Sequence, residues 1–150
     1  MEIRRMTEAD LAEVCEIENE TFSDPWSEED FRNSLQDDKN DYLVAEIDGI
    51  IAGYCGFWGV VGEGDIFNVA VKKEYRRQRI GETMLKALIE KGVTRGITSF
   101  TLEVRISNEP AIRLYEALGF ERAGIRKDFY TKPKEDAVIM WLNTIQQFPL

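Results

Sequence analysis

The feature that most limits how this chain can fold is a strand, a basic loop and a helix that follow one another between residues 65 and 93. The strand expected over 65–71 ends in a nearly unbroken apolar run, which is typical of a strand covered on both faces. The loop over 72–79 leads into a helix over 80–93, whose apolar residues repeat with the helical period. Since another strand is expected over 99–106, the pattern predicts parallel strands joined by a helical crossover.

The other predicted elements complete a mixed α/β sheet with helices on both faces. Short polar and glycine signals separate strands over 2–5, 42–47, 50–60, 120–130 and 136–143 from helices that begin after Thr7, Ser27 and Asn108. The expected order is β-α-α-β-β-β-α-β-α-β-β. No repeat, low-complexity tract or linker divides the sequence, so we predict a single domain over residues 1–150.

The chain contains no histidine, and this limits its chemistry. Ser-His-Asp catalysis is excluded, a catalytic cysteine would lack its usual base, and a metal site is not expected. The two cysteines, Cys15 and Cys55, are far apart, and we expect both to be buried thiols. Acid-base work would therefore fall to carboxylates, tyrosine, lysine or water.

The formal net charge of −9 argues against a nucleic-acid partner, which normally requires a basic face. It is compatible with a basic substrate, although acidity for solubility alone is common. No apolar run approaches the length of a membrane span, and the N-terminus lacks the apolar core of a signal peptide. We therefore expect a cytoplasmic protein with no membrane partner. The oligomeric state stays open, a weak homodimer included.

The basic loop over 72–79 and the helix after it have features typical of an anion-binding site. The first backbone N–H groups of a helix are unpaired and lie at the positive end of its dipole. Arg76, Arg77 and Arg79 add positive charge, and Gly81 lets a ligand approach the backbone. The segment fits a pyrophosphate, while an ordinary solvated loop is the alternative.

The run from Arg76 to Gly81 resembles the Q/R-x-x-G-x-G/A acetyl-CoA motif of the GNAT acetyltransferases. Arg79 departs from it, because the family usually has glycine there; the backbone N–H survives this change, and the arginine suggests that the position avoids positive φ. The resemblance extends over essentially the whole chain. It is carried by Pro25-Trp26-Ser27, the run 67–71, Leu102-Glu103-Val104-Arg105, Asn108, Leu114-Tyr115-Glu116, Leu118-Gly119-Phe120, Ile125-Arg126, Tyr130 and Asp136-Ala137.

This resemblance implies a GNAT-like acyl-CoA N-acyltransferase fold, with acetyl-CoA as co-substrate and no metal. In the family, pantetheine lies between two parallel strands that splay apart, and a backbone N–H of the first strand faces the thioester oxygen. The residues implied in cofactor binding are Val69, Ala70, Val71, Arg76, Arg77, Gln78, Arg79, Ile80, Gly81, Glu82 and Asn108. Asn108 is in addition the expected helix N-cap.

The resemblance also implies a general base, Glu103, and a general acid, Tyr115. Strand alternation places Glu103 on one face with Thr101 and Arg105, which by itself is compatible with an ordinary polar face. Tyr115 would protonate the coenzyme A thiolate; the alternative is a core aromatic residue. Both residues are present, which speaks against a non-catalytic acyl-CoA-binding regulator.

The branch of the family that the chain resembles most acetylates the N-terminal alanine of a small-subunit ribosomal protein. An α-amine has a pKa of about 7.7–8.0, so roughly a tenth is neutral at pH 7, against a few parts in ten thousand for lysine. Trp26, Tyr130 and Asp136 are the candidates for peptide recognition, with packing and loop solvation as the alternative. Another amine, such as a lysine side chain, polyamine or antibiotic, and a subunit that works only inside a complex stay open.

Overall fold

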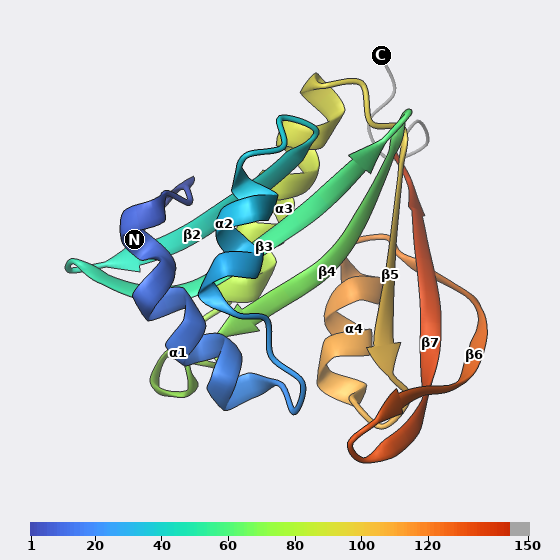
Figure 1. Cartoon of the computed structure of the whole chain (residues 1–150). Helices are drawn as coiled ribbons and strands as arrows, with labels where there is room; N and C mark the ends of the chain where they lie inside the picture. The colour runs from blue at the N-terminus through green and yellow to red at the C-terminus, as the bar shows by residue number, and fades with distance from the viewer. Residues whose placement is uncertain (145–150) are drawn as a thin grey trace.

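A computed structural model describes residues 1–144 of the chain. One seven-stranded sheet has the order β1-β2-β3-β4-β5-β7-β6, and the described α-helices pack against it (Figure 1). The element order is the one that the sequence predicts. The bounds are β1 Glu2–Arg5, α1 Leu11–Thr21, α2 Glu28–Leu35, β2 Asn40–Ile47, β3 Ile50–Val60, β4 Glu63–Val71, α3 Ile80–Thr94, β5 Ser99–Arg105, α4 Glu109–Ala117, β6 Glu121–Thr131 and β7 Lys134–Asn143.

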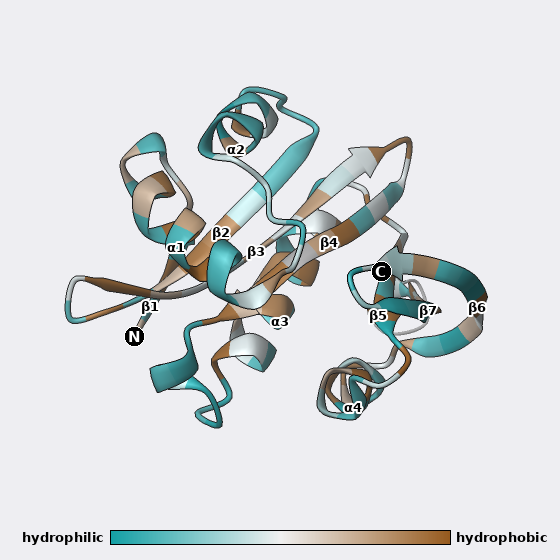
Figure 2. Cartoon of the chain, turned by 60° about the horizontal axis from the view of Figure 1, so that its bottom comes forward, coloured by the Kyte–Doolittle hydropathy of each residue, from teal (hydrophilic) through white to brown (hydrophobic). Residues whose placement is uncertain are grey.

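Helices lie on both faces of the sheet, as predicted, and each face has its own core. Met84, Leu85 and Leu88 of α3 pack with strand residues and with α4 in one buried cluster. Leu11, Val14 and other residues of α1 and α2 pack with the opposite face of the β2–β4 region in a second cluster. Figure 2 shows that apolar segments gather on the central strands and α3, whereas α2 and β6 are mostly hydrophilic.

The β4–β5 pair is parallel and is the pair joined by the α3 crossover. Its ladder runs from Glu63↔Ser99 to Ile66↔Leu102 and stops there, although β4 continues to Val71 and β5 to Arg105. Beyond that point the two strands diverge, which Figure 1 shows as a V that opens toward the end of β4. The pairing of β3 with β4 shifts by one residue between Gly56 and Phe57, which is typical of a β-bulge. Because a bulge bends its strand, this irregularity turns β4 away from β5 where the parallel ladder ends.

The start of the α1–α2 layer is fixed by side-chain caps that the sequence predicts. Asp10 accepts hydrogen bonds from the Thr7 backbone N–H at 2.8 Å and from both terminal nitrogens of Arg4 at 2.9 and 2.8 Å. Arg4 also bonds Glu46 of β2, so it ties β1, the first helical turn and β2 together. This arginine holds the pKa of Asp10 below its usual value, chiefly through the hydrogen bonds that it donates.

Two details differ from the sequence-based expectations. The turn expected over 62–64 is shorter, because β4 already begins at Glu63. Cys55 is buried as expected, whereas Cys15 is only partly buried, because it lies at the edge of the apolar stripe of α1. No helix among residues 1–144 is long and apolar enough to cross a membrane.

Candidate active site

The gap between the diverging halves of β4 and β5 exposes backbone polar groups. The Lys72 N–H donates to Ala52 of β3 at 2.7 Å, so by alternation the N–H of Ala70 also faces β3. The N–H groups of Val69 and Val71 then face the open side, where β5 no longer pairs. The Ile106 N–H bonds Asp136 of β7, and alternation in the same way directs the backbone groups of Glu103 and Arg105 into the gap.

The start of α3 lies at the edge of this gap, and the residue before the helix corrects an expectation. Arg79 was expected to avoid positive φ, yet it adopts the left-handed conformation with φ of 61°. It does so because the chain must turn sharply from the loop into α3, and Arg77 with φ of 67° turns in the same way. The first intrahelical bond joins the Thr83 N–H to the Arg79 carbonyl at 3.0 Å, which leaves the N–H groups of residues 80–82 without helical partners.

Gly81 lies in the first turn of α3, where a side chain would fit without a clash. A Cβ placed there would lie 3.5 Å from Leu114 and 3.7 Å from Val71, which are ordinary contacts. The fold therefore does not require glycine at this position. Arg76 is held in place by a 3.0 Å hydrogen bond from its Nε to the Val71 carbonyl, so it links the loop to the end of β4. Asn108 caps α4 by accepting from the Ala111 N–H at 3.3 Å, as predicted.

Glu103 lies on the face of β5 that turns away from α3 and α4. The burial of β5 alternates, with Leu102 and Val104 in the core and Glu103 on the opposite face, as the sequence predicts. Partial burial raises the pKa of Glu103, Arg126 of β6 opposes this rise, and Asp65 of β4 adds to it. A carboxyl group with a raised pKa is better matched to accepting a proton near neutral pH.

Tyr115 approaches the gap from the other face. It lies on α4 within the core beside Ile112 and Phe120, and only 8% of its surface is exposed. Among residues 1–144 its hydroxyl has no hydrogen-bond partner, and burial raises its pKa above the usual value for a phenol. A desolvated phenol without a partner is unusual in a folded core, and it leaves an O–H available to a ligand.

Tyr130 of β6 has charge interactions with both Glu103 and Tyr115. The pKa of Tyr115 is raised chiefly by burial and further by the nearby charge of Tyr130. Burial together with Glu103 raises the pKa of Tyr130 to about 12. Arg105 lies over its ring, with the guanidinium carbon 4.2 Å from the ring centre. The same arginine donates to Glu135 at 3.1 Å and to backbone carbonyls of the β6–β7 turn, which fixes this turn against β5.

A hollow of about 440 Å³, here called the acceptor hollow, brings two of the three predicted peptide-recognition residues together. Trp26 comes from the α1–α2 loop and Tyr130 from β6, and both line it with Phe67, Arg105 and Glu18. Asp136 is not among the lining residues. Its carboxylate accepts the Asp128 N–H at 2.8 Å, so it supports an irregularity in β6 whose residue Asp128 has φ of 53°.

Several residues of this site were not singled out from the sequence. Glu18 is buried, accepts a hydrogen bond from Tyr54 and another from the Trp26 N–H at 2.9 Å, and so fixes the loop that carries Trp26. The sequence could have indicated Glu18, because a charged residue on the apolar stripe of α1 is expected to be buried and a buried carboxylate needs partners. Asp65 and Arg126 are brought near Glu103 by strand pairing that no local pattern reveals. Among the described residues, no cluster of three or more metal-ligating side chains is found.

Comparison with known proteins gives consistent matches. The model of the Acetyltransferase (GNAT) family matches residues 11–120. An Escherichia coli ribosomal protein bS18-alanine N-acetyltransferase is 37% identical over 142 residues, with 93% of this chain and 95% of that protein covered. A Bacillus subtilis protein proposed to have the same activity is 43% identical over 141 residues, with 93% of each chain covered. The crystal structure of the ribosomal-protein-S18-alanine N-acetyltransferase from Escherichia coli superposes with a TM-score of 0.87, covering 95% of this chain and 92% of that one.

Proposed function

Because the chain belongs to the GNAT family of acetyltransferases, we propose that it moves an acetyl group from acetyl-CoA to the N-terminal α-amino group of a protein. The acceptor that we propose is the N-terminal alanine of ribosomal protein bS18, on which two of its relatives are named as acting or as proposed to act. The observation that carries the mechanism is the gap between β4 and β5, which Glu103 approaches from one face of the sheet and Tyr115 from the other.

The residues around the gap fit acetyl-CoA, the co-substrate that the family uses. The free N–H groups at the start of α3 and the basic loop before it suit a pyrophosphate. Gly81 leaves room for close approach, and the unpaired backbone of β4 and β5 can bond a pantetheine chain. When bound, acetyl-CoA would supply an acetyl group activated as a thioester. The N–H of Val69 or Val71 would donate to the oxygen on which negative charge develops.

Glu103 would act as the general base for the acceptor amine. An α-ammonium with a pKa of about 7.7–8.0 must lose a proton before it can attack, and a carboxylate whose own pKa is raised can accept that proton directly or through water. The amine enters from the face that holds the acceptor hollow, where Tyr130 and Trp26 would hold the first residues of the peptide.

Tyr115 would act as the general acid. Its hydroxyl would donate a proton to the departing coenzyme A sulfur when the new amide bond forms and the carbon–sulfur bond breaks. The raised pKa of Tyr115 keeps it protonated at neutral pH, so it is always loaded as a donor. A thiol has a pKa of about 8.5, so this transfer is uphill from a phenol, and burial of Tyr115 makes it more so. Because no described residue bonds the hydroxyl, the resulting phenolate would have to be stabilised by water or by the bound substrates.

The acceptor is tested with one basic peptide in two forms. In one form the N-terminal alanine is free and the lysines are blocked; in the other the N-terminus is blocked and a lysine is free. We expect acetylation of the first form alone. Acetylation of the second form alone would overturn the α-amine assignment while leaving an acetyltransferase. Reaction with spermidine but with neither peptide would show that a small amine is the acceptor.

A further inference from the structure

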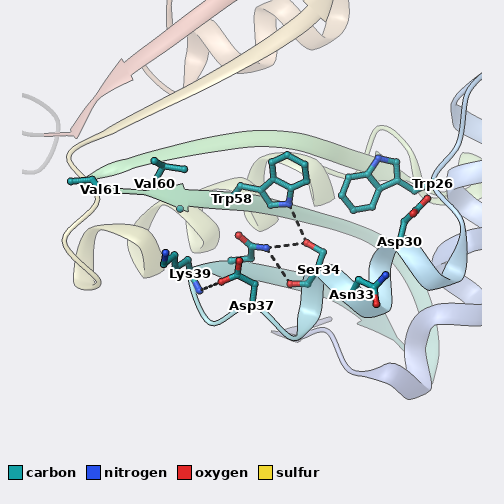
Figure 3. Close-up of a pocket in the computed structure, with 11 residues that line it drawn as sticks. Trp26, Asp30, Asn33, Ser34, Asp37, Lys39, Trp58, Val60 and Val61 are labelled. Atoms are coloured by element: carbon teal, nitrogen blue, oxygen red, sulfur yellow. Dashed lines mark hydrogen bonds between the residues drawn. The ribbon is translucent and has the colours of Figure 1, made fainter.

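A second hollow, here called the outer groove, lies beside the acceptor hollow. It has a volume of about 740 Å³ and is formed by α2, the turn after it and the last residues of β3 (Figure 3). Trp26 lines both hollows, so the two are neighbours on the same face of the sheet. No step of the acetyl transfer described above uses the outer groove.

The outer groove has a fixed apolar surface. Trp58, Val60 and Val61 line it and are 41%, 64% and 99% exposed. The Trp58 indole N–H donates to Ser34 of α2 at 3.1 Å, and its ring lies 4.2 Å from that of Phe67, so the side chain is held in place while one part stays open. Exposed apolar residues gathered in one place, held rigid and rimmed by polar groups are typical of a docking surface.

Acidic charge is concentrated in the α1–α2 layer, of which α2 borders this surface, although Arg32 of α2 pairs with Glu8 and Glu28 at 3.1 and 3.7 Å. Between residues 6 and 31, which contain α1 and the first half of α2, lie ten of the chain's 28 acidic residues and none of its 19 basic ones. The rest of the chain is therefore close to neutral, and this segment accounts for essentially all of the net charge of −9. Asp30 and Asp37 stand at the groove itself, and Lys39 is the one basic residue among those that line it.

One carboxylate, that of Asp65, lies between the groove and Glu103, and Arg126 of β6 interacts with both carboxylates. Asp65 of β4 lies opposite Trp58 in the antiparallel ladder and beside Thr101 of β5 in the parallel one. Cross-strand partners share a face, so Asp65 lies on the face of Thr101 and Glu103, between the groove and the gap. A chain that leaves the acceptor hollow along this face would pass Glu103 and Asp65, with Arg126 near both, before it reaches the apolar surface.

We propose that the outer groove holds a basic, partly apolar segment of the acceptor protein, located downstream of the N-terminus that is acetylated. This inference rests on the proposed function and adds a second contact to it. The acidic layer fits a basic segment by charge complementarity, and Trp58 with Val60 and Val61 offers contact for apolar side chains or for the stems of arginines. A second copy of this chain fits poorly, because two acidic layers would face each other.

The test compares two peptides and two matched variants. The short peptide contains only the first residues of the acceptor, and the long peptide adds an arginine-rich extension with apolar residues and no lysine. The groove variant is Asn33→Lys/Val61→Lys, and both of its sites are exposed and line the groove. The control is Asn19→Lys/Ile50→Lys, which introduces the same two lysines in place of an asparagine and a β-branched apolar residue, at exposed sites on α1 and at the other end of β3, outside the groove.

For the unsubstituted protein we expect a kcat/KM that is higher for the long peptide than for the short one, mainly through a lower KM. The groove variant should lose at least about fivefold in kcat/KM for the long peptide and little for the short one, whereas the control variant should keep most of the difference. Equal losses in both variants would show that overall charge acts and the groove does not, which would overturn the proposal. So would a long peptide that is no better than the short one. If neither peptide is acetylated at its α-amine, the proposed function itself fails.

Discussion

Tyr115 combines deep burial with a hydroxyl that has no partner among the described residues. Tyr115→Phe removes only this hydroxyl, so the core around Phe120 should be unchanged and stability nearly so. Loss of the proton donor should lower kcat by roughly 10²-fold, within the range usual for general acid-base groups. The measurement is steady-state kinetics together with coenzyme A affinity, which should stay near that of the unsubstituted protein. Normal turnover would mean that Tyr115 only packs.

Glu103 is a residue at which activity and stability should change in opposite directions. The pKa of Glu103 is raised in the folded protein, so folding favours the neutral carboxyl group. The contribution of this group to the free energy of unfolding is therefore fully present below its pKa in the unfolded chain. It is lost as the pH rises through its pKa in the folded protein. At neutral pH the ionised carboxylate of Glu103 therefore lowers the free energy of unfolding. Glu103→Gln should keep or raise the free energy of unfolding, measured by urea denaturation, while kcat/KM falls.

The pH profile of the Glu103→Gln protein is a second test of Glu103 as the general base. Without the base, the rise of the rate with pH should flatten or move toward the pKa of the α-amine of the acceptor, about 7.7–8.0. A profile identical to that of the unsubstituted protein would show that Glu103 is not the base.

At the scale of an element, α3 shows two glycines with opposite roles. Gly81→Ala adds a methyl group at ordinary distances and improves helix propensity by about 1 kcal/mol, so the free energy of unfolding should rise. The methyl group would lie beside the free N–H groups to which we assign the pyrophosphate, so the KM for acetyl-CoA should rise several-fold. Gly92→Ala is the matched control: its Cβ would lie 2.5 Å from Phe100, so it should lower stability. An unchanged KM for acetyl-CoA in Gly81→Ala would place the phosphates elsewhere.

The residue before α3 provides a second test of that element. Arg79 adopts a left-handed conformation that costs a non-glycine residue about 1–2 kcal/mol. Arg79→Gly removes this strain and keeps the backbone N–H, so thermal stability should hold or rise and acetyl-CoA binding should stay intact or tighten. A large loss of affinity, measured by calorimetry, would show that the Arg79 side chain binds the phosphates.

The helices and strands also differ in how much of their structure could be predicted from the sequence. Period and capping signals predicted the order of the described strands and helices, because these signals are local: the Thr7–Asp10 capping box forms, and Ser27 and Asn108 cap their helices as expected. Alternation alone placed Glu103 on its face. The left-handed Arg79, the point at which β4 and β5 separate, and the Asp136–Asp128 bond depend on neighbours that are distant in sequence or on a turn geometry that arginine rarely adopts. Those features required the structure.

At the scale of the whole molecule, charge is separated into a basic and an acidic region, one for each of the two proposed substrates. The loop over 72–79 carries five basic residues and one acidic residue beside the start of α3, where the anionic acetyl-CoA is expected. The layer over residues 6–31 carries only acidic charge beside the acceptor hollow and the outer groove. The acidic layer and the basic loop lie on opposite faces of the sheet, so we expect the net charge of −9 to repel the anionic substrate less than its size alone would imply.

This separation predicts how salt affects the reaction. Raising the ionic strength from about 50 to about 500 mM shortens the Debye length from roughly 14 to roughly 4 Å, which screens steering by both regions. For a basic peptide, kcat/KM should fall by roughly tenfold through KM, with kcat nearly constant because the groups at the gap are in contact with the substrate. A peptide with the same first residues and glutamine in place of its basic residues should show little salt dependence on the acceptor side, while the KM for acetyl-CoA should rise with salt for both peptides. A basic peptide whose KM does not change with salt would show that the acidic layer has no part in capturing the acceptor, since screening acts on every exposed charge.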